Sequence, residues 1–228
     1  GLTLGQAIQK LMGRPVQPQD LKGSRSPYLS LWDINSRVIV TQCGTAGDPG
    51  TSGTEWIFSL DEISEKRLQD FPGGLQGALS SRCYLMAHPK PMITKMSVMS
   101  QVTGLDNSSL LPPYVPVFRG EDYTFGAMSE YMHPNAAVME YDWSVPHLPV
   151  DERTGDPDPK PHSGKGLLNI NKYVTDRTVY QPGISPETRL NSLAAILHEL
   201  ASIDDRGLMT IFRREVGESQ GMQFSSLN

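Results

Sequence analysis

The sequence has 228 residues, including 21 Gly and 18 Pro, and a formal net charge of −5. So many residues that interrupt regular backbone exclude a coiled coil or a helical bundle, while the 38% hydrophobic content excludes a disordered chain. The sequence contains no dense run of Lys and Arg interleaved with aromatic residues, which argues against nucleic-acid binding. We therefore expect a loop-rich, mixed α/β fold with no nucleic-acid partner.

The cysteines and the apolar segments indicate the compartment. Cys43 and Cys83 are too few and too far apart to define a zinc site or a disulfide scaffold, although a single bridge between them stays open. Two reduced thiols are typical of a cytosolic protein. No apolar run approaches the roughly 18 residues that span a bilayer, and the N-terminus lacks the apolar core of a signal peptide. The sequence therefore predicts a cytoplasmic protein without a membrane span.

The sequence predicts both helices and strands. In chain order they are a helix over residues 4–12, strands over 37–42 and 55–60, a helix from Asp61 to Pro72, a helix leading into a short strand over 75–86, a helix over 123–132 and a strand over 136–141. The first helix has apolar residues at helical spacing, and Gly13 and Pro15 end it. The first strand has three consecutive β-branched residues and leads into a Gly-rich loop over residues 43–53. Residues 91–102 are apolar and fit either a helix or a strand.

The C-terminal part is predicted to consist of two consecutive helices. Ser185 and Pro186 are typical of a helix start, and apolar residues at helical spacing follow to Ala201. A second helix is predicted from Asp204 to Val216, so we expect an α-helical hairpin. The predicted organisation is a mixed α/β portion over 1–153, a Pro- and Gly-rich linker over 154–183 and the helical hairpin over 184–228.

The Gly-rich loop over residues 43–53 is the first candidate site. Its glycines let backbone amides approach a ligand, and Asp48 supplies a carboxylate. The loop matches neither a phosphate-binding P-loop nor the dinucleotide-binding fingerprint, because it lacks a Gly-Lys-Ser/Thr ending and Pro49 interrupts the expected helix start. Two interpretations stay open: a wide surface loop, or an active-site loop at the carboxyl end of a strand.

The second candidate is the turn from Arg119 to Asp122. Glu121 and Asp122 come at the start of a predicted helix, where the backbone dipoles stabilise carboxylates. A carboxylate in a cleft is a natural general base for a hydroxyl proton. The alternative is that these acids only cap the helix.

The third candidate is the segment from Asp142 to His147. Pro146 and Pro149 restrict this segment, and a His with nearby carboxylates suits Mn, Zn or Fe, whereas Mg prefers oxygen ligands only. A lone His is also often structural. Residues 119–158 contain nine acidic and two basic side chains, so this tract either binds a cation or is solvated loop.

Three segments within residues 38–153 resemble the downstream half of nucleotide-sugar glycosyltransferases of the GT-A type. They are Gly-Asp-Pro-Gly at 47–50, Phe-Arg-Gly-Glu-Asp at 118–122 before Tyr-Thr-Phe-Gly, and Trp-Ser-Val-Pro-His-Leu-Pro at 143–149. The resemblance is closest to bacterial family-2-like proteins and covers about half of the chain. It implies an α/β fold with a mixed, loop-rich GT-A sheet.

The resemblance also implies a reaction and a set of site residues. A nucleotide-sugar would donate the sugar to an acceptor hydroxyl with the help of a divalent metal, Mn or Mg. The family's acidic turn falls on Asp122, with Glu121 beside it, as the catalytic base, and the downstream His that completes the metal shell falls on His147. Asp48, Arg119 and Trp143 would line the donor or acceptor site.

One part of the family pattern is missing from residues 1–37. The Asp-x-Asp metal motif normally ends an early strand after a nucleotide-binding region, and no such strand or motif is present in this segment. Either the chain is the C-terminal portion of a longer enzyme whose N-terminal half is its partner, or the fold has lost sugar-nucleotide binding; we expect the first. The rival hypotheses are a non-catalytic protein-binding or scaffold module that uses the acidic face and the helical hairpin, and a loop-rich structural protein.

Overall fold

A computed structural model of the chain describes most of the regular elements. The described residues are 1–15, 17, 19, 31–48, 57, 60, 62–86, 89–95, 97, 102–114, 121–151, 173 and 183–226. The chain divides into two compact units, which we describe separately. Unit 1 comprises Gly1–Thr45, Met86–Val145 and Ile170–Ala201, and unit 2 comprises Ala46–Leu85, Pro146–Asn169 and Ser202–Asn228.

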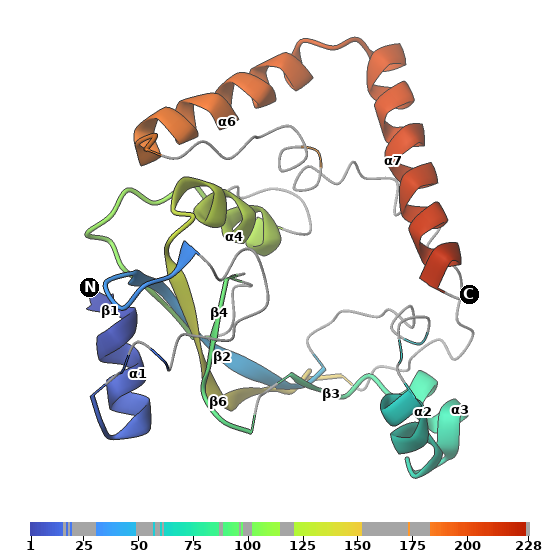
Figure 1. Ribbon diagram of the computed structural model, residues 1–228. Coiled ribbons are helices and arrows are strands. Elements are labelled where there is room, and N and C mark those ends of the chain that lie inside the picture. Colours follow the sequence, from blue (N-terminus) through green and yellow to red (C-terminus); the bar gives the residue numbers. More distant parts are fainter. Residues whose placement is uncertain are drawn as a thin grey trace. The chain divides into compact units, whose positions relative to one another are not determined.

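The described residues form both helices and strands (Figure 1). In order they are β1 (Leu2–Thr3), α1 (Leu4–Met12), β2 (Arg37–Gly47), α2 (Glu62–Gln69), α3 (Gly74–Ser80), β3 (Tyr84–Met86), β4 (Met92–Thr94), β5 (Thr103–Leu105), α4 (Glu121–Met132), β6 (Ala137–His147), α6 (Pro186–Ala201) and α7 (Asp205–Ser226). None of the described helices combines the length and the apolar character needed to cross a bilayer.

The strands form one mixed sheet around two long strands, β2 and β6. The order is β1-β2-β6-β4, and β3 and β5 also pair with β2. Gln42 Nε2 donates to Glu140 Oε1 at 2.6 Å, and the backbone N–H of Asp48 donates to the carbonyl of His147 at 2.9 Å. Residue numbers rise together in these two contacts, so β2 and β6 are parallel. The short strands β1, β4 and β5 pair antiparallel with them. The predicted mixed α/β class is therefore confirmed.

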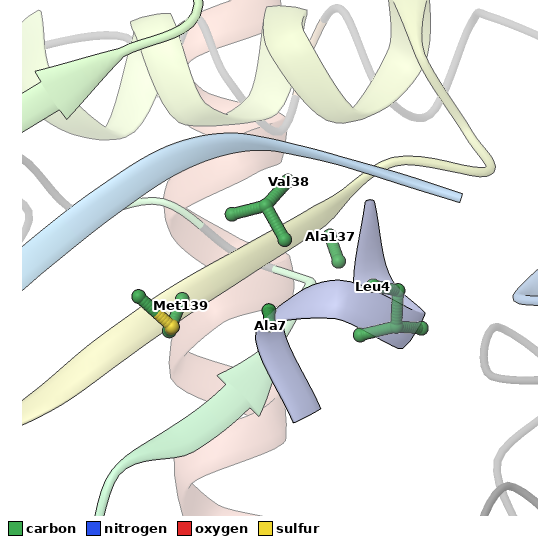
Figure 2. Packing of buried hydrophobic residues seen from close by; sticks show 5 residues of the cluster. All are labelled: Leu4, Ala7, Val38, Ala137 and Met139. Carbon is green, nitrogen blue, oxygen red and sulfur yellow. The ribbon is translucent and has the colours of Figure 1, made fainter. Parts of the chain in front are cut away.

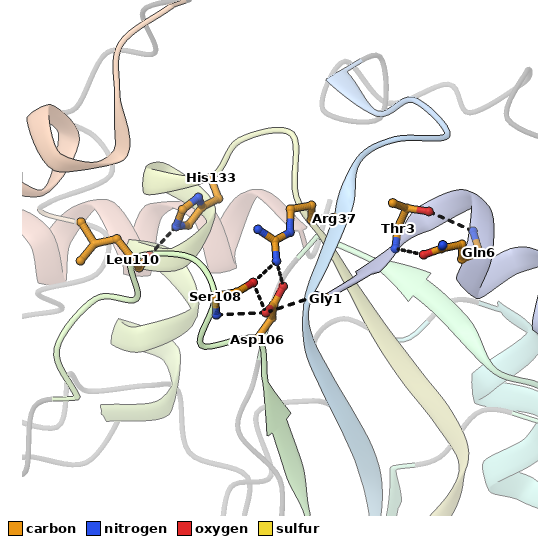
Figure 3. A network of polar contacts seen from close by, with 8 residues as sticks. All are labelled: Gly1, Thr3, Gln6, Arg37, Asp106, Ser108, Leu110 and His133. Atoms are coloured by element: carbon orange, nitrogen blue, oxygen red, sulfur yellow. Dashed lines mark hydrogen bonds and ion pairs between the residues drawn. The ribbon is translucent and has the colours of Figure 1, made fainter.

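Helix α1 has the boundaries that its sequence predicts. The Thr3 side chain accepts from the backbone N–H of Gln6, and the Gln6 side chain accepts from the backbone N–H of Thr3, which is a complete capping box (Figure 3). Gly13 ends the helix in the left-handed conformation, with φ 68°. Both ends are therefore set by local side-chain and backbone chemistry.

The first face of the sheet in unit 1 is covered by α1. Leu4 and Ala7 of this helix pack on Val38, Ala137 and Met139 of the two long strands (Figure 2). Leu4 and Ala137 are fully buried. At about 25 cal/mol per Å² of apolar surface, such burial is the main stabilising contribution to this layer.

The opposite face of the sheet is covered by α4, and α6 packs on α4 in turn (Figure 1). Val138 alternates with Ala137 and Met139 along β6, so its side chain points to the α4 side, where Phe125 contacts it. Met128 and Met132 of α4 pack on Leu193 of α6. Unit 1 therefore has the layer order α1, sheet, α4, α6.

The two long strands extend further than the sequence predicts. Residues 43–47, predicted as the start of a loop, belong to β2, and β6 continues from the predicted end at Tyr141 to His147. The glycines and the proline in these segments have weak intrinsic strand preference, but pairing in the sheet satisfies the backbone groups of both segments. The predicted start of the 43–53 loop is therefore wrong by five residues. The predicted strand over 55–60 lies outside the described residues except for 57 and 60.

The helices of unit 2 follow the sequence prediction with one extension. Helix α2 packs on α3, and Gly73 and Gly74 make the connection between them with φ values of 80° and 60°. Residues 84–86 form the short strand predicted after α3, and the ambiguous segment 91–102 contains strand β4. Helix α7 continues to Ser226, beyond the predicted end at Val216.

The predicted domain boundaries at 153 and 183 stay a prediction. Of the predicted linker over 154–183, only residues 173 and 183 are among the described residues. Both C-terminal helices are confirmed. The hairpin that they were predicted to form stays a prediction, because α6 belongs to unit 1 and α7 to unit 2.

Candidate functional site

Glu121 and Asp122 are the first two residues of α4. The helix begins two residues before the predicted start at Tyr123, so both carboxylates lie in its first turn. The unpaired backbone N–H groups of a first turn favour negative charge by about 0.3–1 kcal/mol per carboxylate. Both predicted catalytic side chains therefore lie at the positive end of the helix dipole.

Tyr114 forms a hydrogen bond with Asp122, and no motif in the sequence predicts this contact. The Tyr114 hydroxyl donates to Asp122 Oδ1, and its ring packs against Phe125 with centroids 5.9 Å apart and planes at 43°. The hydrogen bond to Asp122 is the main reason that the pKa of Tyr114 is raised to about 12. Within the described part of the chain, no hydrogen bond or ion pair joins the Glu121 carboxylate to another residue. The two neighbouring acids therefore have different surroundings.

Trp143 lies on β6 and presents an aromatic surface together with Tyr141. The two rings stack with centroids 5.2 Å apart and planes at 17°. Their spacing of two residues places them on the same face of the strand, and Trp143 is 42% exposed. Asp142, between them, points to the other face. A flat, partly exposed aromatic pair suits contact with the apolar face of a ring-shaped ligand.

Asp48 is buried and paired at the end of β2. Arg82 donates to it from Nε to Oδ2 at 3.0 Å and from Nη2 to Oδ1 at 3.2 Å. This two-contact geometry is the strongest form of an Arg–carboxylate interaction. Arg82 lies between α3 and β3, and nothing in the sequence pattern around it indicates the pair. Asp48 is thus fixed by a cation of the same unit.

His147 ends β6 beside the end of β2. Its carbonyl accepts the backbone N–H of Asp48 at 2.9 Å, and a Cβ added to Gly47, which has φ 102°, would overlap the same carbonyl oxygen. The Nδ1 atom of His147 is buried and has no hydrogen-bond partner among the described residues. The carboxyl ends of parallel strands are where open α/β sheets usually bind ligands, so this is the expected place for a site in unit 2.

The predicted site residues fall into two groups. Asp48 and His147 meet in unit 2, while Glu121, Asp122 and Trp143 belong to unit 1. Arg119 lies outside the described residues. Among the side chains that the structure describes, no group of three or more His, Cys, Asp or Glu residues could hold a metal ion. Both cysteines are free, with Cys43 buried and Cys83 exposed.

Comparisons of the chain with protein-family models, with curated proteins and with solved structures gave no match. The resemblance to glycosyltransferases therefore depends on the three sequence motifs. The structure adds the surroundings of their residues, which are the basis of the proposals below.

Proposed function

We propose that this chain forms the acceptor side of a nucleotide-sugar glycosyltransferase of the GT-A type, which transfers a sugar to an acceptor hydroxyl with the help of a divalent metal. The observation that best supports this function is the pair of carboxylates in the first turn of α4, one of them oriented by a tyrosine hydroxyl. A base oriented by a third group is the arrangement that activation of a hydroxyl requires.

Asp122 is the base in this proposal. Its Oδ1 atom accepts the Tyr114 hydroxyl, so Oδ2 is the atom that takes the proton of the acceptor hydroxyl. The acceptor oxygen then forms the new bond to the anomeric carbon, and the bond from that carbon to the diphosphate oxygen breaks. Glu121 lies about 100° further round the helix and interacts with the bound sugar or acceptor by hydrogen bonds.

The stacked pair of Tyr141 and Trp143 contacts the ring of the donor or acceptor in this proposal. Two stacked, nearly parallel and partly exposed rings offer apolar contact area at low entropic cost. Arg119 interacts with the negatively charged donor. Since Asp48 is fixed by Arg82, its contribution is to hold the end of β2 beside His147.

The metal in this proposal is Mn²⁺ or Mg²⁺, and His147 is its ligand from the described residues. A buried imidazole nitrogen without a hydrogen-bond partner has the donor chemistry that a metal ligand needs, which favours Mn²⁺ over the oxygen-preferring Mg²⁺. When bound, the metal neutralises the charge that develops on the leaving diphosphate. The oxygens of Asp48 are engaged by Arg82, so the other ligands come from elsewhere.

The experiment is a transfer assay with the Asp122→Asn variant. The full-length protein is incubated with a panel of nucleotide-sugars, Mn²⁺ and hydroxyl acceptors, and release of nucleoside diphosphate is measured. Loss of a general base lowers the rate by about 10²–10⁴-fold. Asp205→Asn removes an exposed carboxylate from the first turn of α7 and serves as the matched control, with turnover near that of the unmodified protein. Full turnover in folded Asp122→Asn protein contradicts the assignment of the base.

A second candidate function, a protein-binding module, is supported by the surface of α7. This helix exposes Met209, Met222 and Phe224, of which Phe224 is 65% exposed. Thermal shift with nucleoside diphosphate and Mn²⁺ separates the two candidates, because a bound ligand stabilises the folded state by mass action. A binding module is not stabilised by these ligands.

A further inference from the structure

We propose that Tyr114 is a positioning residue of the transfer site, which holds the Asp122 carboxylate in a single orientation with Oδ2 available to the acceptor hydroxyl. The role depends on the proposed function, since it concerns the base of that reaction. No sequence motif of the chain points to Tyr114; only its contacts do.

Tyr114 contacts α4 at two points. Its hydroxyl donates to Asp122 Oδ1, and its ring packs against Phe125. Asp122 and Phe125 are three residues apart, so they lie on the same face of the helix, one above the other. A single tyrosine side chain therefore spans both, with its polar end at the first turn and its ring one turn further on.

Phe125 is a rigid support for the Tyr114 ring. It is 3% exposed and belongs to the core formed with Ile39, Val40 and Val138 of the sheet. A ring packed on such a residue loses little further freedom when its hydroxyl forms a hydrogen bond. Asp122 therefore lies on the sheet-facing side of α4, and the orientation of its carboxylate is tied to the core of unit 1.

The hydrogen bond also selects one of the two acids. Tyr114 donates to Asp122, while the Glu121 carboxylate has no hydrogen-bond or ion-pair partner in the described residues. An aspartate held by one oxygen presents the other in a fixed direction, as a general base needs. The phenol remains protonated at neutral pH, because the pKa of Tyr114 is raised to about 12, so it donates throughout the working range.

The first test is spectroscopic and independent of activity. In the chain with ¹³Cζ-labelled tyrosine, the Tyr114 signal is assigned by its loss in Tyr114→Phe, and its ionisation is followed to pH 11. At that pH a phenol with a pKa of about 12 is about one-tenth ionised, and one at the ordinary value of 10 is about nine-tenths ionised. We expect Tyr114 to be about one-tenth ionised at pH 11 in the unmodified chain and about nine-tenths ionised in Asp122→Asn. Glu121→Gln is the matched control, in which Tyr114 stays largely un-ionised. An ordinary titration in the unmodified chain overturns the inference.

The second test is kinetic and uses the full-length protein. We expect Tyr114→Phe to lower kcat by about 10–100-fold with the KM for the nucleotide-sugar unchanged, because misplacing a base by an ångström costs rate and not donor binding. Tyr123→Phe, which changes an exposed tyrosine of the same helix, retains full kcat. Equal kcat in the two variants overturns the positioning role. Absence of transfer by the unmodified protein with every donor contradicts the proposed function, while the spectroscopic test still decides whether Tyr114 holds Asp122.

Discussion

Asp48 and Arg82, which are 34 positions apart in the sequence, form a two-contact ion pair that joins the end of β2 to the segment before β3. Their side chains are only 9% and 12% exposed, so the charges are largely removed from water. Such a pair contributes little net stability compared with apolar residues, but loss of one partner leaves a buried, uncompensated charge.

Replacing Arg82 by Met is therefore expected to destabilise the protein by about 3–5 kcal/mol, measured by urea unfolding. Arg213→Met is the matched control, because Arg213 is exposed on α7. Replacing an exposed surface residue of this kind changes the free energy of unfolding by about 0.5 kcal/mol or less. Equal losses of stability in the two variants would show that burial of the Asp48–Arg82 pair does not increase the cost of removing its cation.

Gly47→Ala is expected to be more destabilising than Gly13→Ala. Both glycines have positive φ, 102° and 68°, so both substitutions incur the backbone penalty of about 1–2 kcal/mol. A Cβ at Gly13 meets no atom within 4 Å, whereas at Gly47 it overlaps the carbonyl oxygen of His147. The additional cost at Gly47 is about 1–3 kcal/mol, from overpacking. Thermal or urea unfolding of the two variants measures it, and similar values for both would argue against the close approach of the strand ends.

Acid stability is expected to depend on Asp106 and Ser108. The Ser108 hydroxyl donates to Asp106 Oδ1 at 2.7 Å and accepts from Arg37 Nη2, which also pairs with Asp106 (Figure 3). The Ser108 hydrogen bond is the largest cause that lowers the pKa of Asp106 below its ordinary 3.8. A lowered pKa means that this stabilisation is present above pH 3.8 and is lost as the pH falls through the folded-state value.

Ser108→Ala is accordingly expected to move the acid-unfolding midpoint to higher pH, followed by circular dichroism between pH 7 and 2. Ser109→Ala is the matched control, because the hydrogen bond of Ser109 in this turn joins its backbone N–H to the Asp106 carbonyl and does not involve its hydroxyl. Coincident acid-unfolding curves for the two variants would contradict the role of the Ser108 hydroxyl.

His147→Ala is expected to weaken Mn²⁺ binding by at least about 10-fold, measured by isothermal titration calorimetry of the full-length protein. The reason is the buried Nδ1 atom, which has no hydrogen-bond partner in the described residues. His198→Ala, on the exposed side of α6, leaves Mn²⁺ affinity unchanged. Unchanged affinity in His147→Ala removes this residue from the metal site.

The boundaries of α1 and the helix-start position of the two acids follow from the sequence alone. The capping box of Thr3 and Gln6 and the left-handed Gly13 involve residues within one turn of each other, so local chemistry is sufficient to predict α1. The same reasoning predicts that Glu121 and Asp122 lie at the start of a helix, and in the structure that helix begins two residues earlier than predicted.

Strand length and the contacts of the site depend on tertiary structure. Residues 43–47 include two glycines and an alanine, which are depleted in strands, yet they belong to β2 because neighbouring strands supply the hydrogen bonds of their backbone. Sequence patterns likewise do not identify the partners of Asp48 and Asp122. A buried charge selects its partner by position in space, and only the folded chain brings Arg82 to Asp48 and seats Tyr114 on Phe125 beside Asp122. Local chemistry thus determined where the acids lie along the chain, and packing between distant segments decided which of them is held.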